Sequence, residues 1–315
     1  MKKFLKKVLT FLLLFSGINI FFVFTIPKDQ DNYLCEYNHK VQLIEHTRQP
    51  RIILIGGSNV PFGIDSQTIK DSLKTNVVNF GLHGGIGIKY PLEDCLQYIK
   101  KGDIVIIQME YEQFTGSGEG EPETLLPFMI ATNWRKIGLL SFNQWVNILL
   151  GVPQVVVSNL KRLALYPFIG SFNSPPNNSN FEYRKSGFNE FGDEISHRKY
   201  SSQESPSIIN NIKKDKNINS SFISWLNETL NKYEMIGAHI IMLPPVCTTT
   251  QFKNSYNLNI KNALDSIKHP YAVDASHMVV DDSCYFNTGY HVNNNGILQN
   301  SNNIINIIRN SVFKK

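Results

Sequence analysis

A serine and a histidine near opposite ends of the chain have the types and surroundings needed for acyl transfer. Ser58 follows the apolar run Arg51–Ile55 and the pair Gly56-Gly57, and a tight turn there would expose its hydroxyl while nearby backbone amides face the same space. His291 lies in the loop before the last predicted helix. Because a serine hydroxyl is a weak nucleophile until an imidazole accepts its proton, we predict Ser58 as the nucleophile and His291 as its base.

Two plainer interpretations of these residues stay open. Gly56-Gly57-Ser58 could be an ordinary strand-to-helix turn, and a histidine is more often structural than catalytic in a chain that has eight of them. Glycine-rich turns also bind phosphate. Neither G-x-G-x-x-G nor G-x-x-x-x-G-K-[ST] occurs in this turn, so phosphate binding is the less favoured interpretation.

The elements that must position these residues alternate between short apolar runs and amphipathic segments. The runs predict strands and the segments between them predict helices. This alternation predicts an α/β fold with a three-layer, doubly wound parallel sheet, in which ligands bind at the carboxyl ends of the strands. The expected strands are 51–55, 76–80, 103–109, 239–243 and 271–273, and the expected helices are 65–74 (capped by Asp65 or Ser66), 91–100, 221–236, 257–268 and 296–312.

Residues 115–217 interrupt this alternation. An apolar part at 125–165 predicts helix, and a part rich in proline, asparagine and serine follows it. We interpret the segment as an insertion or lid within one α/β domain of residues 28–315. In its "GFNEFGD" segment, Asn189, Gly192 and Asp193 predict a capped glycine turn, or alternatively a glycan contact or a source of acid. Aromatic side chains that could stack on sugars, although packing is their more frequent role, are Tyr111, Phe114, Phe188 and Phe191.

The N-terminus predicts a membrane anchor over residues 1–27. Val8–Ile26 carries no charge, and as a helix it would span about 28 Å, close to the thickness of the bilayer hydrocarbon core. The lysines before it place residues 28–315 outside the cytoplasm by the positive-inside rule. A cleaved signal peptide is the alternative, although no small-x-small site precedes Pro27. Residues 27–50 then read as a polar connector.

Charge and cysteine content exclude two other classes of function. Of the formal net charge of +5, four charges come from Lys2, Lys3, Lys6 and Lys7, so no basic stripe is left to bind nucleic acid. The four cysteines form no CxxC pair, which makes a zinc site improbable. One or two disulfides and buried free thiols remain equal alternatives. The Ser58 and His291 chemistry requires no metal or organic cofactor.

Four segments together resemble the SGNH/GDSL hydrolase superfamily. They are "IILIGGSNVPFGID", "VVNFGLHGG", "DIVIIQMEYEQF" and "YFNTGYHVNNNG". The resemblance covers roughly residues 50–115 and 220–312 and is strongest to the membrane-anchored bacterial branch, similar to proteins that O-acetylate envelope polysaccharides such as alginate or transfer D-alanine to teichoic acid. It implies Ser58 as nucleophile, His291 as base and, as the glycine whose amide binds the oxyanion, Gly81 in preference to Gly84 or Gly85.

The chain departs from this family in two places. Where the family has G-x-N-D after the third strand, this chain has Glu110-Tyr111-Glu112, and we expect both carboxylates to point away from an oxyanion, toward an arginine or to assist His291. The acid expected shortly before the histidine is Asn287, which in a serine-protease triad holds the imidazole in the wrong tautomer. The missing charge could come from Asp281 or Asp282 through a different loop path.

The function expected from these residues is that of an extracytoplasmic serine esterase or O-acyltransferase acting on an acylated cell-surface glycan. The alternative is a catalytically silent binding or assembly partner of a multipass membrane acyltransferase, and Asn287 favours it. A soluble cytoplasmic enzyme is disfavoured by Val8–Ile26.

Overall fold

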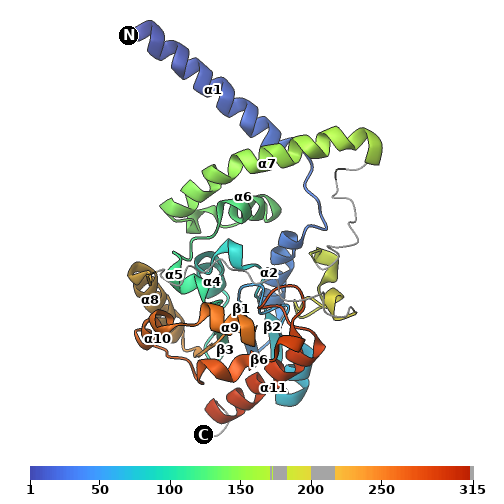
Figure 1. The fold of residues 1–315 in the computed structure, drawn as a ribbon, viewed down its shortest axis with the longest axis vertical. Coiled ribbons are helices and arrows are strands. Elements are labelled where there is room, and N and C mark those ends of the chain that lie inside the picture. Colours follow the sequence, from blue (N-terminus) through green and yellow to red (C-terminus); the bar gives the residue numbers. More distant parts are fainter. Residues whose placement is uncertain (171, 173–182, 200–216, 313–315) are drawn as a thin grey trace.

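A four-stranded parallel sheet lies at the centre of the protein (Figure 1). The computed structural model describes residues 1–170, 172, 183–199 and 217–312. The strand order is β2-β1-β3-β4, so the winding direction reverses between β1 and β3. The strands are β1 (Arg51–Gly56), β2 (Asn76–Asn79), β3 (Ile104–Gln108) and β4 (His239–Leu243), and a separate parallel pair joins β5 (Cys247–Thr248) to β6 (Val279–Val280).

Eleven helices accompany these strands in the described part of the chain. They are α1 (Lys2–Phe24), α2 (Glu36–His46), α3 (Ser66–Leu73), α4 (Lys89–Leu96), α5 (Glu112–Thr115), α6 (Pro122–Ala131), α7 (Phe142–Ile169), α8 (Ser220–Ile236), α9 (Thr249–Ser255), α10 (Leu258–Asp265) and α11 (Asn294–Ser311).

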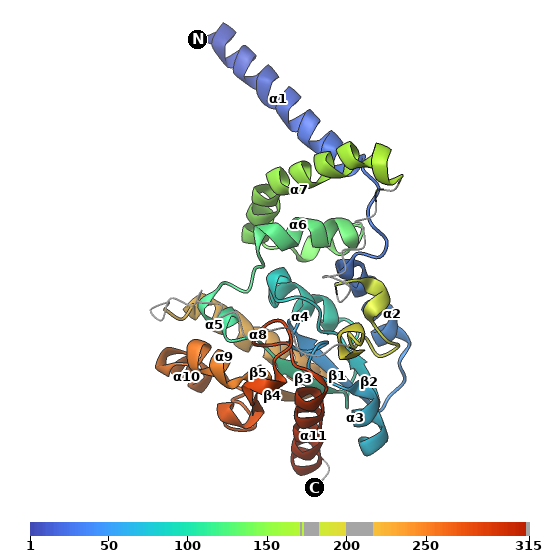
Figure 2. The same cartoon turned by 45° about the vertical axis from the view of Figure 1, so that its right-hand side comes forward.

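The sheet is buried on both faces. Successive residues of β1 point to opposite sides of the sheet, and all of them are buried. Ile52 and Leu54 pack into a cluster with α3 and α11. Ile53 and Ile55 pack into a larger cluster with α2, α4 and α8 (Figure 2). The predicted sheet with helices on both faces is therefore present, and its apolar strands have no polar face because neither side meets water.

Helix α1 projects from the rest of the protein, and α7 lies across its base (Figures 1 and 2). Both helices are long and apolar enough to cross a membrane by length and composition. Helix α6 packs beneath α7, where a side chain at Gly151 would lie 2.3 Å from the carbonyl oxygen of Pro122. Helices α6 and α7 of the insertion therefore form a helical layer next to α1.

Most of the predicted elements are present, with shifted ends. Asp65 accepts a hydrogen bond from the Thr68 amide at 3.2 Å and is the predicted cap of α3. The expected strand at 271–273 is wrong, because only Tyr271 pairs, with Met242, before Asp274 caps a 3-10 turn.

Three other expectations can be compared with the structure. The helical part expected at 125–165 is present as two helices, α6 and α7, since the backbone between them turns through positive φ angles at Asn133, Trp134 and Lys136. The polar connector at 27–50 contains α2, whose Val41 and Ile44 are buried. All four cysteines are buried free thiols, not disulfides. Of the insertion, residues 171, 173–182 and 200–216 lie outside the described structure.

Candidate functional site

Ser58 and Glu110 meet where the loops after β1 and β3 diverge. Ser58 Oγ donates a hydrogen bond to Glu110 Oε1 at 3.2 Å. The turn after β1 is tight, since Phe62 N donates to the Ser58 carbonyl at 3.1 Å, and a Cβ at Gly56 would lie 2.2 Å from the Gln108 carbonyl oxygen. Both loops lie at the carboxyl ends of β1 and β3, between which the winding direction of the sheet reverses. Open parallel sheets bind ligands at this point, which is called the topological switch point.

The Glu110 carboxylate fills the space between two glycines. A Cβ at Gly57 would lie 2.6 Å from Oε1, and a Cβ at Gly84 would lie 2.4 Å from Oε2. The backbone amides of Ser58 and Asn59 also donate to this carboxylate. The Ser58 and Asn59 amides therefore donate to the Glu110 carboxylate. Converging amides of this kind are also what an oxyanion formed during acyl transfer would require.

Burial raises the pKa of Glu110 to about 7, and the neighbouring Glu112 adds to the increase. Hydrogen bonds from Ser58 and from the amides of Ser58 and Asn59 oppose it. Desolvation disfavours the charged form of a carboxyl group, whereas donors to that form favour it. Near neutral pH, Glu110 is thus divided between a form that can accept the Ser58 proton and one that cannot.

The expectation for the two glutamates is half right. Glu110 does not point away from the turn at Ser58, since its carboxylate lies in the space between Gly57 and Gly84. Glu112 does point away, and accepts hydrogen bonds from the Tyr290 hydroxyl at 2.7 Å and from Ser255 Oγ at 3.1 Å. Gln251 Nε2 also donates to Glu112 Oε1 at 3.3 Å. These contacts of Glu112 are not the arginine or His291 contacts proposed from the sequence.

Within the described structure, the contacts of the His291 ring are with residues other than Ser58. Its ring stacks on Phe62 with centroids 4.0 Å apart, and its Nδ1 is 2.7 Å from Asn287 Oδ1. Its Nε2 is buried and has no hydrogen-bond partner among the described residues. Among the described residues, Ser58 Oγ is therefore hydrogen-bonded to Glu110 and not to His291 as the sequence predicted.

Asn287 nevertheless occupies the place of the third triad residue relative to His291. Its Nδ2 donates to the Tyr183 hydroxyl at 3.2 Å, which orients Oδ1 to accept the Nδ1 proton of His291 and leaves a lone pair on Nε2. Burial lowers the pKa of His291 well below its ordinary value, and His197 and His83 lower it further. The ring is thus neutral and, in its tautomer, able to accept a proton at Nε2.

The alternative acids do not reach His291. Asp282 accepts hydrogen bonds from the Thr250 amide at 2.9 Å and from Thr250 Oγ1 at 2.7 Å. Asp281 accepts from the Ser283 amide at 2.9 Å and caps the turn that follows it. The suggestion that either supplies the missing charge is wrong in this structure, since the Asp282 carboxylate binds the start of α9 and the Asp281 carboxylate caps its own turn.

The predicted oxyanion glycines lie in different surroundings. The Gly81 amide donates to Asn79 Oδ1 at 3.2 Å, and Val60 lies 2.5 Å from where a Cβ of Gly81 would be. Gly84 faces the Glu110 carboxylate, whereas the space beside Gly85 is taken by Thr124 of α6. Gly84, the second choice from the sequence, is therefore the glycine at the site, and the preference for Gly81 is not supported by its contacts.

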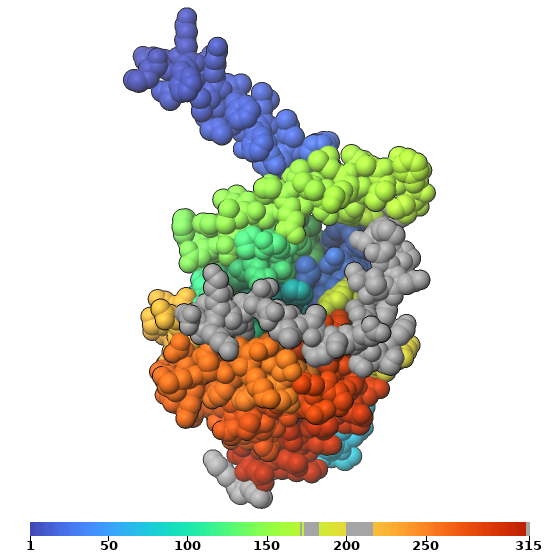
Figure 3. Space-filling view, in the orientation of Figure 1, coloured from blue at the N-terminus to red at the C-terminus, as the bar shows by residue number. Residues whose placement is uncertain are grey.

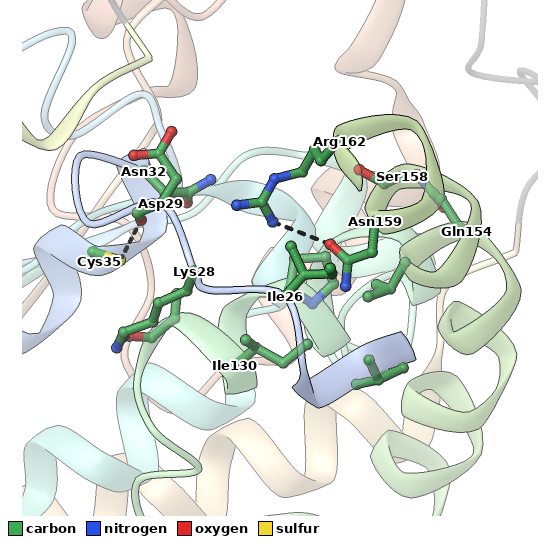
Figure 4. Close-up of a pocket in the computed structure, with 14 residues that line it drawn as sticks. Ile26, Lys28, Asp29, Asn32, Cys35, Ile130, Gln154, Ser158, Asn159 and Arg162 are labelled. Atoms are coloured by element: carbon green, nitrogen blue, oxygen red, sulfur yellow. Dashed lines mark hydrogen bonds between the residues drawn. The ribbon is translucent and has the colours of Figure 1, made fainter. Parts of the chain in front are cut away.

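A narrow cavity of about 10 Å³ adjoins this pair, and its lining includes Gly57, His83, Gly84, Glu110 and Gln113. A larger cavity of about 200 Å³ lies elsewhere, between the end of α1, α6 and α7 (Figure 4). None of the predicted site residues lines the larger cavity. The candidate site is therefore chosen by the chemistry of its residues and not by the size of its cavity.

The "GFNEFGD" segment has the structural role that the capped turn predicted. Asp193 is fully buried and accepts hydrogen bonds from the Ser66 amide at 2.9 Å, from Ser66 Oγ at 2.6 Å and from Asn79 Nδ2 at 2.8 Å. It joins the insertion to the start of α3 and to the end of β2. Asn189 Oδ1 accepts from the Asp193 amide at 2.9 Å, and Gly192 has φ +87°.

The aromatic side chains considered for sugar stacking are packing residues for the most part. Tyr111 and Phe114 are fully buried, and Phe191 is buried as well. Phe188 lies under the Lys40 ammonium, 4.7 Å from the ring centroid. Within the described residues, none of the four offers an open ring face at the Ser58 turn.

One buried hydrogen-bonded pair near His291 was missed from the sequence. His197 Nδ1 lies 2.5 Å from Glu194 Oε2, and His197 Nε2 is 3.2 Å from the Val292 carbonyl oxygen. Both side chains are fully buried. The sequence signal that could have indicated this pair is the spacing of three residues between Glu194 and His197 in a short polar turn. This pair fixes the insertion against the loop that carries His291.

Comparison with protein-family models, with curated proteins and with solved structures finds no match to this chain. The assignment of the site therefore depends on its own geometry.

Proposed function

We propose that the protein is a serine esterase or O-acyltransferase that acts outside the cytoplasm on acyl groups of a cell-surface polysaccharide. The observation that carries the proposal is the hydrogen bond from Ser58 Oγ to the buried Glu110 carboxylate at the switch point of the sheet. The strand order and the helices on both faces agree with the SGNH-like fold that the sequence segments resemble. The lysines before α1 support the location outside the cytoplasm.

Glu110 is the general base in this proposal. Ser58 Oγ attacks the acyl carbonyl carbon, and its proton passes to Glu110 Oε1, across a contact of 3.2 Å. The carboxyl group is then neutral and no longer competes for the Ser58 and Asn59 amides, which can donate to the oxyanion. Collapse of the tetrahedral intermediate breaks the bond to the first alcohol, which leaves with the proton from Glu110. Water or a sugar hydroxyl then attacks the acyl-serine carbonyl and gives its proton to Glu110, which returns it to Ser58 Oγ as the acyl group leaves.

A pKa near 7 suits this role. A general base works best when its pKa is close to the working pH, because it is then both deprotonated and basic enough to accept a proton. Glu110 meets that condition. His291 is retained as the alternative base predicted from the sequence, because its buried Nε2 has no hydrogen-bond partner among the described residues and could accept a proton.

A second candidate function is that of a catalytically silent binding partner of a membrane acyltransferase. The observation that favours it is the position of Glu110 between Gly57 and Gly84, where its carboxylate occupies the amides that an oxyanion would need. Such a protein would keep the fold and the buried carboxylate but would not form an acyl-enzyme.

Labelling with a fluorophosphonate, which reacts only with an activated serine, separates the two candidates. We expect the full chain to be labelled at pH 8, Ser58→Ala to lose all labelling, and Glu110→Gln to label roughly 10²- to 10⁴-fold more slowly. His291→Asn should retain most of the rate, since His291 does not touch Ser58. If His291→Asn loses the label and Glu110→Gln keeps it, Glu110 is not the base; if folded wild-type protein is never labelled, the silent partner is supported.

A further inference from the structure

Helix α7 exposes apolar side chains on the side that faces away from the rest of the protein. The outward side chains include Phe142 (82% exposed), Leu149 (67%) and Leu150 (63%). The inward side combines apolar residues with two buried amides, and its buried residues are Gln144, Ile148, Gly151, Val155 and Asn159. Surface helices of soluble proteins normally put apolar residues inward and polar residues outward.

The outward side chains form one continuous stripe. With 3.6 residues per turn, residues spaced three, four and seven apart lie on the same side of a helix. The stripe includes Phe142, Trp145, Leu149, Leu150, Val157 and Leu160, and all of them are exposed. Figure 3 shows α7 as a ridge along the end of the protein from which α1 projects. Soluble monomers rarely expose an apolar stripe of this length.

Helix α7 is attached to the end of α1. Asn159 Nδ2 donates to the Phe22 carbonyl oxygen at 2.8 Å, and Arg162 donates to the Pro27 carbonyl oxygen. Phe24 packs on Trp134, with ring centroids 5.8 Å apart. If α1 crosses the bilayer, as proposed for its location, its last turn lies at the membrane surface and α7 lies at the same level.

We infer that α7 lies in the membrane interface with its apolar stripe in contact with lipid, so that the protein touches the bilayer along α7 as well as through α1. An interfacial helix of this kind buries its apolar face about 5–10 Å into the boundary between headgroups and acyl chains. A spanning α7 is disfavoured, because it would have to leave α6 and expose Gln144, Asn159 and Arg162 to hydrocarbon.

The same arrangement sets the height of the Ser58 site above the membrane. The start of α6 contacts the loop after β2, where Glu121 N donates to the Gly85 carbonyl oxygen at 2.7 Å. Gly84 of that loop borders the Glu110 carboxylate. The carboxyl ends of the strands therefore face the layer of α6 and α7, on the membrane side of the sheet, where a substrate held near the bilayer would meet Ser58.

Fluorescent labels on single introduced cysteines test this inference in the full chain, reconstituted into phosphatidylcholine vesicles. The native cysteines are all buried, and unlabelled wild type gives the background. Leu149→Cys reports on the stripe, Leu13→Cys on α1, and Met235→Cys on α8, where Met235 is 87% exposed. The measurement is quenching by lipids brominated near the headgroup or near the chain end.

We expect Leu149→Cys to be quenched by lipid brominated near the headgroup, Leu13→Cys by lipid brominated deeper, and Met235→Cys by neither. If Leu13→Cys is quenched and Leu149→Cys behaves like Met235→Cys, the inference is overturned while the anchor stands. If neither is quenched, both the anchor and the inference fail. Quenching of Leu149→Cys at the depth of Leu13→Cys would overturn it in favour of a spanning helix. Disulfide-linked pairs of unlabelled Leu149→Cys, with no quenching of the labelled protein, would overturn it in favour of a second copy.

Discussion

Replacing Glu110 with glutamine should stabilise the protein above pH 7 and leave its stability nearly unchanged below pH 4.5. Glutamine has the shape of the protonated glutamate and fits the same space between Gly57 and Gly84. It cannot ionise, so it removes the cost of holding a carboxylate in a buried site. The direction follows from the raised pKa of Glu110, which burial moves to about 7 from 4.5.

A carboxyl group whose pKa is higher in the folded protein binds its proton more tightly there than in the unfolded chain. Its contribution to stability is fully present below pH 4.5 and is lost as the pH rises through about 7. At about 1.4 kcal/mol per pH unit, the raised pKa corresponds to about 3 kcal/mol. Glu110→Gln should therefore be up to about 3 kcal/mol more stable than wild type at pH 8.

The assay is urea unfolding of both full-length proteins in the same detergent at pH 4 to 8, followed by tryptophan fluorescence. Glu123→Gln, which removes an exposed carboxylate from α6, is the matched control for the change in charge. Carbon NMR of labelled Glu110 gives the pKa directly. Parallel stability curves for wild type and Glu110→Gln from pH 5 to pH 8, or a Glu110 titration near pH 4.5, would refute the buried ionisable carboxylate.

Two further changes test other parts of the structure. Arg51 donates to Asp103 at 2.8 Å with both side chains fully buried, so Arg51→Met should lower the free energy of unfolding in urea by about 3–5 kcal/mol. Adding Asp103→Leu should recover most of this loss. An unchanged unfolding midpoint for Arg51→Met alone would contradict the importance of the pair. Asn287→Asp puts a carboxylate beside Nδ1 of His291 and should raise the pKa of His291 by roughly 1 to 3 pH units. Nitrogen NMR of the His291 ring measures this change, and an unaltered titration would show that the two side chains do not meet.

The elements whose local signals agreed with their final surroundings were predictable. The isoleucine-rich run before Ser58 could only be a buried strand, and the Asp65 cap set the start of α3. Helix α2 was missed because its buried residues are few and are separated by polar ones, such as Lys40, that become buried only against the rest of the protein. The loop positions of Ser58 and Glu110 were likewise predictable, since both follow apolar strands directly.

The sequence by itself determined an apolar N-terminal helix, an alternation of strands and helices, and the placement of Ser58, Glu110 and His291 in loops, because hydrophobic periodicity and turn residues act over a few positions. Only the tertiary structure decided which of these loops touch. The strand order placed β1 beside β3 and so brought Glu110, not His291, to Ser58. Contacts between residues far apart in the chain depend on how strands pair and side chains pack, and no local pattern encodes the direction in which Glu110 or the outer face of α7 points.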